Sequence, residues 1–236
     1  MNKLKVLQVN KLYYPEIGGI EKVVQQVAEE LKEKVDMEVL VCKRKGKGYS
    51  ETINGIKVTR SGSFGIYFSM PVSISFLVRL KIMSRNKDVI LFHMPFPLGD
   101  LAGILSGYKG KIIVWWHSDI VRQKYLLKLY EPLMMKFLKR ADKIVVATEG
   151  HIKNSKYLKE FKDKCVIIPY GVDNSIIQDS YNYTARENNS KEITFLFVGR
   201  LVYYKGCEIL VRAFAKLNIG RLIIAGNGPQ IGRAHV

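Results

Sequence analysis

The sequence predicts an α/β protein made of two Rossmann-like domains, each built on a mostly parallel sheet, with the second domain incomplete. Apolar segments of strand length alternate with amphipathic segments of helix length along most of the chain, which is typical of parallel sheets covered by helices. The alternation stops over residues 181–191, which are rich in Asn, Ser and charged side chains, and it resumes at Ile193. Glycine-containing loops follow several apolar segments, where sheets of this kind bind ligands.

The first domain is predicted over residues 1–178, and its elements follow from hydrophobic periodicity. Continuous apolar runs predict strands at Leu4–Val9, Met37–Cys42, Asp88–His93, Lys111–Trp116, Lys143–Thr148 and Cys165–Ile168. Apolar residues at helical spacing predict helices at Ile20–Lys34, Val72–Ser84, Gly99–Ser106, Lys124–Lys139 and Gly150–Lys159. A further strand over Asn54–Arg60 is expected to belong to a hairpin.

Residues 179–230 are predicted to form the start of the second domain, which is truncated. Its elements are a strand, a helix and a second strand, at Ile193–Val198, Gly206–Leu217 and Arg221–Ala225. Because these elements cannot cover both faces of a sheet, we expect apolar sheet surface to be exposed. The last residues, 231–236, break the pattern and match one reading frame of a common sequencing adapter, so they are predicted to be a non-native tail.

Charge is the unusual property of the chain. The formal net charge is +17, with 47% hydrophobic and 25% charged residues, so the rest of the composition is that of an ordinary globular protein. Such a field favours anionic partners, which include phosphorylated substrates, acidic lipid surfaces and nucleic acid. The chain has no RNP-like aromatic strand, zinc-finger spacing or dense basic recognition helix, so we expect no nucleic-acid partner.

Cysteine usage and the N-terminal sequence predict a cytoplasmic protein. Cys42, Cys165 and Cys207 are widely separated, and no signal peptide precedes the first strand. Basic residues accompany apolar side chains that are candidates for exposure, which predicts contact with the inner face of the cell membrane; these are Ile66, Tyr67, Phe68, Met70 and Phe76. The helix Lys124–Lys139 has two interpretations, a basic amphipathic helix on a membrane or a covering helix with a solvated basic face.

The segment Val198–Gly206 predicts a phosphate site. Arg200 leaves the end of an apolar strand, and Lys205 precedes the following helix. Ligands collect at the carboxyl ends of parallel strands, where helix N-termini offer unpaired N–H groups to anions. An Arg that can chelate two oxygens, together with a mobile Lys charge, suits a diphosphate.

Four other positions carry weaker signals of the same kind. Gly18 and Gly19 stand between the first strand and the first helix, at a spacing that is not Gly-x-Gly-x-x-Gly, so alone they also fit a tight turn. His117 follows the strand Lys111–Trp116, where it either binds a ligand or has a structural role only. Asp119 either binds a ligand or caps the next segment. The loop of Gly226, Asn227 and Gly228 either lines a nucleotide or forms a plain turn.

Taken in order, these motifs resemble glycosyltransferase family 4, whose members are retaining GT-B enzymes with nucleotide-sugar donors. The resemblance runs from residue 4 to about residue 230 and rests on Gly18-Gly19, Trp116–Asp119, Pro169–Asp173, Val198–Gly206 and Ala225–Pro229. It implies catalytic roles for His117, Arg200 and Lys205. It also implies donor binding by Gly19, Arg200, Lys205, Gly226, Asn227 and Gly228, and acceptor binding by Gly18, Gly19 and Asp119.

The function implied is sugar transfer from a nucleotide-diphosphate sugar to a lipid-linked or cell-envelope glycan. The alternatives are a GT-B-like epimerase or phosphorylase and a non-enzymatic module that binds anions or membranes. No metal and no cofactor are expected, because His93, His151 and His235 lack ligand-like spacing and protein cations would neutralise the diphosphate. The family's Glu-x7-Glu segment would lie beyond residue 230, so the chain as it stands is expected to be an incomplete and inactive enzyme.

Overall fold

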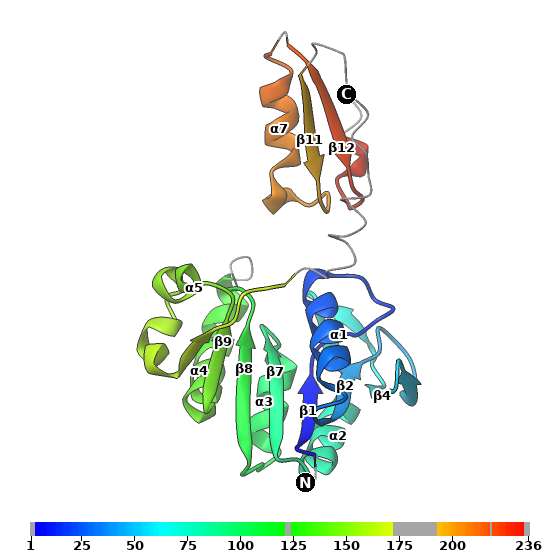
Figure 1. Ribbon diagram of the computed structural model, residues 1–236, viewed down its shortest axis with the longest axis vertical. Helices are drawn as coiled ribbons and strands as arrows, with labels where there is room; N and C mark the ends of the chain where they lie inside the picture. Colours follow the sequence, from blue (N-terminus) through cyan, green and yellow to red (C-terminus); the bar gives the residue numbers. More distant parts are fainter. Residues whose placement is uncertain (1–2, 121–123, 172–192, 218, 234–236) are drawn as a thin grey trace. The chain divides into compact units, whose positions relative to one another are not determined.

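The computed structural model describes residues 3–120, 124–171, 193–217 and 219–233 (Figure 1). The chain forms two compact units, Met1–Gly171 and Val172–Val236. The domain boundary predicted at residue 178 lies outside the described residues. Each unit is therefore considered by itself.

An eight-stranded sheet forms the centre of the first unit, in the order β10-β9-β8-β7-β1-β2-β4-β3. All neighbours are parallel except β3 and β4, which form the predicted hairpin. The strands are β1 (Lys5–Val9), β2 (Asp36–Cys42), β3 (Tyr49–Ile53), β4 (Ile56–Ser61), β7 (Val89–Met94), β8 (Lys111–Trp116), β9 (Lys143–Val146) and β10 (Cys165–Ile167). The predicted parallel α/β architecture is confirmed, with strand ends shifted by a residue or two.

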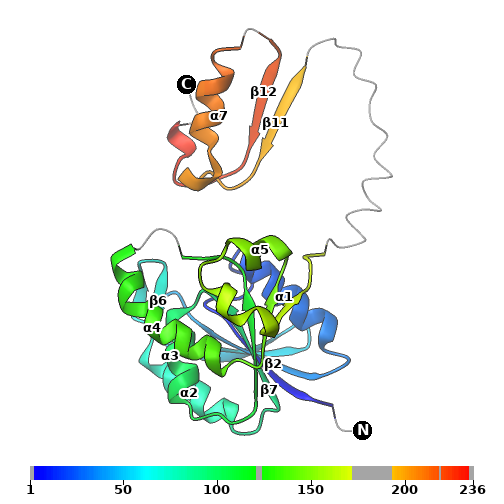
Figure 2. The same ribbon diagram turned by 90° about the vertical axis from the view of Figure 1, so that its left-hand side faces the viewer.

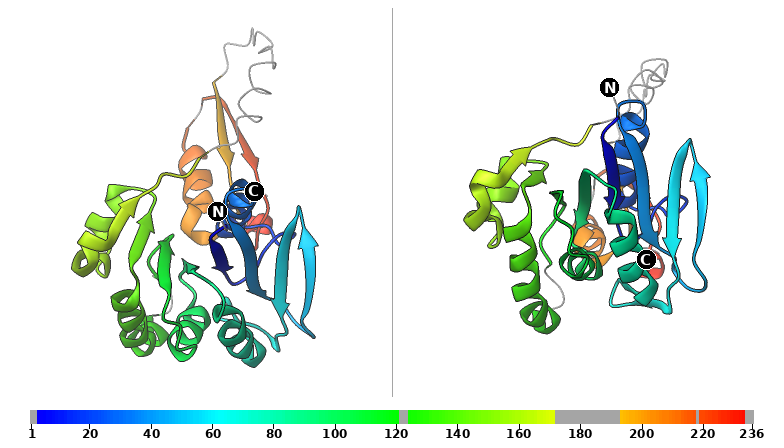
Figure 3. Two further views of the ribbon diagram at one scale, coloured as in Figure 1. Left: turned by 60° about the horizontal axis from the view of Figure 1, so that its bottom comes forward. Right: turned by 90° about the horizontal axis from the view of Figure 1, so that it is seen from below.

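Helices cover both faces of this sheet. On one face α2 (Ile74–Ser84), α3 (Pro97–Leu105) and α4 (Lys124–Arg140) pack over a core that contains Phe76, Ala102 and Phe137 (Figures 2 and 3). On the other face α1 (Gly19–Leu31) packs through Val24 and Ala28. The expectation that Phe76 is exposed to a membrane is wrong, because its side chain is fully buried in this core.

The helix α4 covers the sheet and turns its charged residues to solvent. Its apolar residues Leu127, Met134 and Phe137 are buried, whereas Lys128 and Lys136 are exposed. Because the apolar face is used in the core, the structure favours the covering helix over a membrane-lying helix.

The helix predicted over Gly150–Lys159 is wrong as one element. It is split into α5 (Glu149–Asn154) and the 3₁₀ helix η1 (Leu158–Lys164). Ser155 adopts an extended backbone between them, and its Oγ accepts hydrogen bonds from the backbone N–H groups of Tyr157 and Leu158. A serine that satisfies neighbouring N–H groups in this way competes with the helix and ends it.

The second unit contains a two-stranded parallel sheet and one α-helix in its described part. These are β11 (Thr194–Val198), α7 (Cys207–Phe214) and β12 (Arg221–Ala225), with short 3₁₀ turns at Tyr203–Lys205 (η2) and Ile231–Arg233 (η3). All three predicted elements are present, although α7 ends before the predicted Leu217. The expected exposure of sheet surface is confirmed, since Leu196 and Val198 are 64% and 71% exposed.

Candidate active site

The carboxyl edge of the first unit's sheet gathers the polar residues of interest. The strands β1, β7 and β8 are adjacent and parallel, so their carboxyl ends lie side by side. His93 lies near the end of β7, and His117 follows β8, where its backbone N–H donates to the carbonyl of Met94. The sequence prediction that His117 lies at this edge is confirmed.

His117 stands in the middle of a hydrogen-bonded chain of side chains. Its Nε2 lies 2.9 Å from Nδ1 of His93, and its Nδ1 lies 2.8 Å from the hydroxyl oxygen of Tyr170. The two imidazole rings are inclined by 12°, and the His117 and Tyr170 rings by 8°. Both nitrogens of His117 are therefore engaged, and a ligand would reach Nδ1 only by replacing the hydroxyl of Tyr170.

Burial keeps both histidines neutral at physiological pH. Loss of solvent lowers the pKa of His117 to about 4 and lowers that of His93 well below its usual value. The neighbouring imidazoles reinforce the effect, since His151 acts on His117 and His117 acts on His93. His117 consequently serves as a neutral hydrogen-bonding group at this site.

Asp119 has a role within the fold. Its Oδ1 accepts a hydrogen bond of 3.1 Å from the indole N–H of Trp116, which is itself buried. The carboxylate thus holds the loop after β8 against the end of that strand. Acceptor binding by Asp119 stays a prediction.

The paired glycines open the first turn of α1. A side chain at Gly18 would meet the Glu21 carboxylate at 2.1 Å, whereas nothing lies within 4 Å of a side chain at Gly19. Gly19 is exposed and is the first residue of the helix. With Glu21 in the same turn, this N-terminus is better suited to a hydroxyl ligand than to a phosphate.

Sequence reasoning missed a buried acid close to this edge. Asp100, in the first turn of α3, is fully buried, and the Tyr130 hydroxyl donates to its Oδ2. Its Oδ1 has no partner among the described residues. Burial raises the pKa of Asp100 to about 8. Burial also lowers the pKa of Lys11, and the nearby acids Glu21 and Asp100 partly oppose that lowering. The available signal was a carboxylate within the otherwise apolar segment Pro97–Leu105.

In the second unit, the structure brings together both motifs that were predicted to bind the donor. The backbone N–H of Gly199 donates to the carbonyl of Ala225, and that of Leu201 donates to the carbonyl of Asn227. A side chain at Gly226 would lie 1.9 Å from the Gly199 carbonyl oxygen, and one at Gly228 would lie 2.3 Å from that of Leu201. The two glycines are therefore required for the close packing of one backbone loop on the other.

The two predicted cations project from this paired loop. Arg200 and Lys205 are exposed, and among the described residues neither side chain forms a hydrogen bond or an ion pair. Lys205 ends η2, and Gly206 then adopts a φ of 71° that favours glycine and starts α7. Within the described residues, the loop thus presents two positive charges without a compensating anion at the carboxyl ends of β11 and β12.

No cluster of three or more His, Cys, Asp or Glu side chains suited to a metal ion occurs in the part of the chain that the structure describes. Within the same residues, no helix combines the length and the apolar character needed to cross a bilayer.

The family model for Glycosyltransferase Family 4 matches residues 17–175, which is well over half of the chain. The chain belongs to glycosyltransferase family 4. It is 33% identical over 229 residues to the O-antigen chain mannosyltransferase C of Escherichia coli, covering 96% of this chain and 62% of that protein. It is 34% identical over 235 residues to the D-rhamnosyltransferase WbpZ of Pseudomonas aeruginosa, covering 96% and 60%.

Solved structures share the fold of this family 4 chain at low sequence identity. The crystal structure of Anabaena Alr3699/HepE in complex with UDP and glucose matches 98% of this chain and 62% of that one, with a TM-score of 0.63 and 13% identity. The GT-B assignment made from the motifs is thereby confirmed. The chain spans about three fifths of the length of the curated relatives named above.

Proposed function

We propose that the protein to which this chain belongs is a retaining glycosyltransferase that moves a sugar from a nucleotide-diphosphate sugar to a lipid-linked or cell-envelope glycan. The observation that carries the proposal is the paired loop of the second unit, which presents Arg200 and Lys205 without compensating anions among the described residues. In this proposal the second unit binds the donor diphosphate. The first unit binds the acceptor, at the carboxyl edge that holds Gly18, Gly19, His117 and Asp119.

The chemistry places different demands on the two sets of residues. Negative charge builds on the departing diphosphate, and preorganised cations lower the barrier by stabilising that charge. Arg200 and Lys205 supply this stabilising positive charge, without a metal ion or another cofactor. His117 is neutral at physiological pH, so it orients a sugar hydroxyl by a hydrogen bond and does not act as an imidazolium acid.

The relatives support the choice of acceptor and donor class. One is named for mannosyl transfer to an O-antigen chain and the other for D-rhamnosyl transfer, so both names describe hexose or deoxyhexose transfer. A related fold has been crystallised with UDP and glucose. For this protein we propose an envelope polysaccharide acceptor on the cytoplasmic side of the membrane, and the donor sugar is to be found by screening.

The test uses the complete protein with a panel of nucleotide sugars, with and without acceptor. Arg200→Ala and Lys205→Ala are each expected to lower turnover about 10²–10³-fold. Arg212→Ala is the matched control, because Arg212 pairs with Glu208 on α7 and lies outside the loop. Full activity is expected in EDTA. Turnover of both loop variants at the level of the wild type would defeat the proposal, and epimer formation without acceptor or a requirement for phosphate would favour the alternative enzymes.

We also propose that the first unit associates peripherally with an anionic membrane. The hairpin of β5 (Gly65–Tyr67) and β6 (Met70–Val72) exposes Phe64, Tyr67 and Phe68, the last by 76%. Its turn residues Phe68 and Ser69 have φ values of 50° and 64°, where Asn-Gly is usual. A bulky aromatic side chain held in a strained turn and in solvent is costly, which favours an interfacial role.

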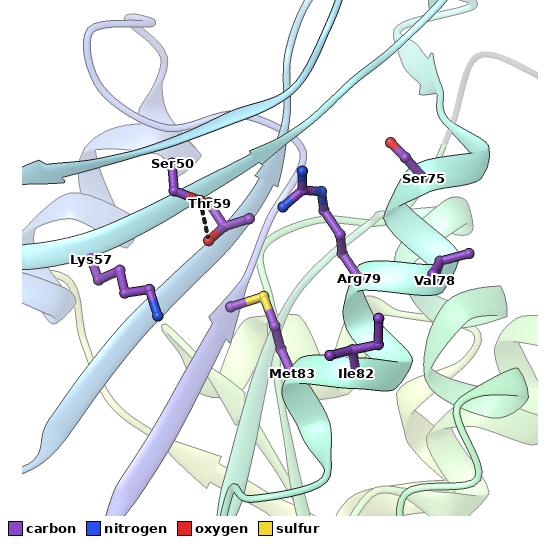
Figure 4. Close-up of a pocket in the computed structure, with 8 residues that line it drawn as sticks. All are labelled: Ser50, Lys57, Thr59, Ser75, Val78, Arg79, Ile82 and Met83. Atoms are coloured by element: carbon purple, nitrogen blue, oxygen red, sulfur yellow. Dashed lines mark hydrogen bonds between the residues drawn. The ribbon is translucent and has the colours of Figure 1, made fainter.

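An apolar stripe on α2 and nearby cations extend this surface. Ile74, Val78 and Ile82 lie at successive helical turns and are 65%, 55% and 58% exposed. Beside them, a hollow of about 560 Å³ lies between α2 and the β3–β4 hairpin, and Figure 4 shows Lys57 and Arg79 directed into it from opposite walls. Apolar side chains beside cations suit an anionic lipid surface.

Cosedimentation with vesicles tests this second proposal on the 236-residue chain. We expect recovery with phosphatidylglycerol vesicles at low salt, weaker recovery at high salt, and little recovery with phosphatidylcholine. Phe68→Ser is expected to reduce recovery, whereas Leu105→Ser, which alters an exposed residue at the far end of α3, is the control. Equal amounts in the supernatant with and without anionic vesicles would reject the proposal.

A further inference from the structure

His93 lies where it can determine which nitrogen of His117 carries the proton. Its Nδ1 is 2.9 Å from Nε2 of His117. It is 1% exposed, and its ring stacks on Trp115 with 5.7 Å between ring centroids. On the outer side of His117, Tyr170 is 47% exposed, so the row of hydrogen-bonded side chains runs from a buried imidazole to a half-exposed tyrosine.

The protons in the hydrogen-bonded row of His93, His117 and Tyr170 have only two possible arrangements. Because both imidazoles are neutral, each has one N–H, and one hydrogen lies between the two rings. If His93 Nδ1 donates, then His117 carries its proton on Nδ1 and donates to the Tyr170 oxygen. If His93 Nδ1 accepts, then His117 carries its proton on Nε2 and accepts from the Tyr170 hydroxyl.

The unpaired nitrogen of His93 separates these arrangements. His93 Nε2 is buried and has no hydrogen-bond partner among the described residues. In the first arrangement this nitrogen is a bare acceptor, whereas in the second it is a buried N–H without an acceptor. Buried orphan N–H groups are the rarer kind. The indole N–H of the stacked Trp115 is already one such donor, so the second arrangement would place two of them together.

We propose that His93 is a positioning residue that holds His117 in the Nδ1–H form, so that His117 donates a hydrogen bond outward to an oxygen of the bound substrate. The Tyr170 hydroxyl occupies the position of that oxygen in this structure. The chemical class of ligand is an oxygen acceptor, and under the proposed glycosyltransferase function it is a sugar hydroxyl. Only this last identification rests on the proposed function.

Nitrogen-15 NMR of the histidine rings tests the inference on the 236-residue chain at pH 7 without any substrate. We expect His117 to carry its hydrogen on Nδ1 in the wild type. The same form is expected in Tyr170→Phe, because His93 and not Tyr170 sets it. In His93→Leu, which removes the inner donor, His117 is expected to gain the Nε2–H form. Tyr157→Phe, another tyrosine whose hydroxyl is not bonded to His117, is the matched control.

An Nε2–H form in the wild type would overturn the inference, and so would loss of the Nδ1–H form in Tyr170→Phe. Both measurements stand even if His93→Leu fails to fold. In the complete enzyme, His93→Leu is expected to lower kcat about tenfold with a smaller change in the KM of the donor. Since the tautomer is measured without turnover, failure of the glycosyltransferase proposal and failure of this inference give different results.

Discussion

The two units differ in how completely their sheets are covered by helices and buried. In the first, helices cover both faces of the sheet, and its central strands are buried along most of their length. In the second, β11 and β12 are largely exposed, and within the described residues only Leu201 and Cys207 are buried. The first unit can therefore bury polar groups such as His93 and Asp100 and shift their proton affinities. The second presents its charges, Arg200 and Lys205, in the open.

The largest expected difference between the units concerns their apolar cores. Phe137→Ala should destabilise the first unit by about 3–5 kcal/mol, because Phe137 is fully buried and packs edge-on against Phe92 at 4.8 Å. Phe195→Ala in the second unit removes a ring that is already 36% exposed, so a smaller loss is expected there. Urea unfolding followed by tryptophan fluorescence reports on the first unit alone, since both tryptophans lie in β8. The loss in Phe195→Ala is followed instead by amide hydrogen exchange in β11 and β12. Equal losses of unfolding free energy in the two variants would contradict the contrast.

A second comparison concerns the glycines of the paired loop. Gly226→Ala should cost about 1–3 kcal/mol locally, since the new methyl group would meet the Gly199 carbonyl at 1.9 Å. Faster amide hydrogen exchange at Leu201, which donates to Asn227, would report the opening of the loop. Gly232→Ala, with nothing within 4 Å of the added methyl group, is the control. Unchanged exchange in Gly226→Ala would show that the close approach is not required.

The buried side chain of His117 makes the stability of the first unit depend on pH, and the sign of that dependence follows from its pKa. The pKa of His117 is lowered from 6.5 to about 4 on folding, so the unfolded chain binds more protons below pH 6.5 and stability falls as the pH falls. The contribution lost between pH 7 and pH 5 is about 2 kcal/mol. Asp100, whose pKa is raised to about 8, acts in the opposite direction, so the test compares the wild type with His117→Gln. A similar loss in both proteins would exclude this role of His117.

Much of the fold followed from the sequence because its strands are continuous apolar runs. The carboxyl-edge positions of His117 and Arg200 followed from the same pattern, since parallel strands end at one edge. The burial of Asp100 did not follow, because an acid in the first turn of a helix is usually placed there by the helix dipole at the surface. His93 resembled a core residue within a strand, and its partnership with His117 depends on the register of β7 and β8. The polar strand β3 lacked an apolar run and was visible only through its hairpin.

The smallest structural effect is expected for Gly19→Ala. Because this substitution leaves the fold almost unchanged, a loss of turnover would report on function and not on folding. Nothing lies within 4 Å of a side chain there, so Gly19→Ala should change the stability of the first unit by less than about 1 kcal/mol. If substrate approaches the first turn of α1, the added methyl group will nevertheless lower turnover of the complete enzyme. Gly18→Ala is a useful partner, because its methyl group would meet only the flexible end of Glu21. Normal turnover in Gly19→Ala together with normal stability would remove this turn from the acceptor site and leave the edge around His117 as the place where the first unit binds substrate.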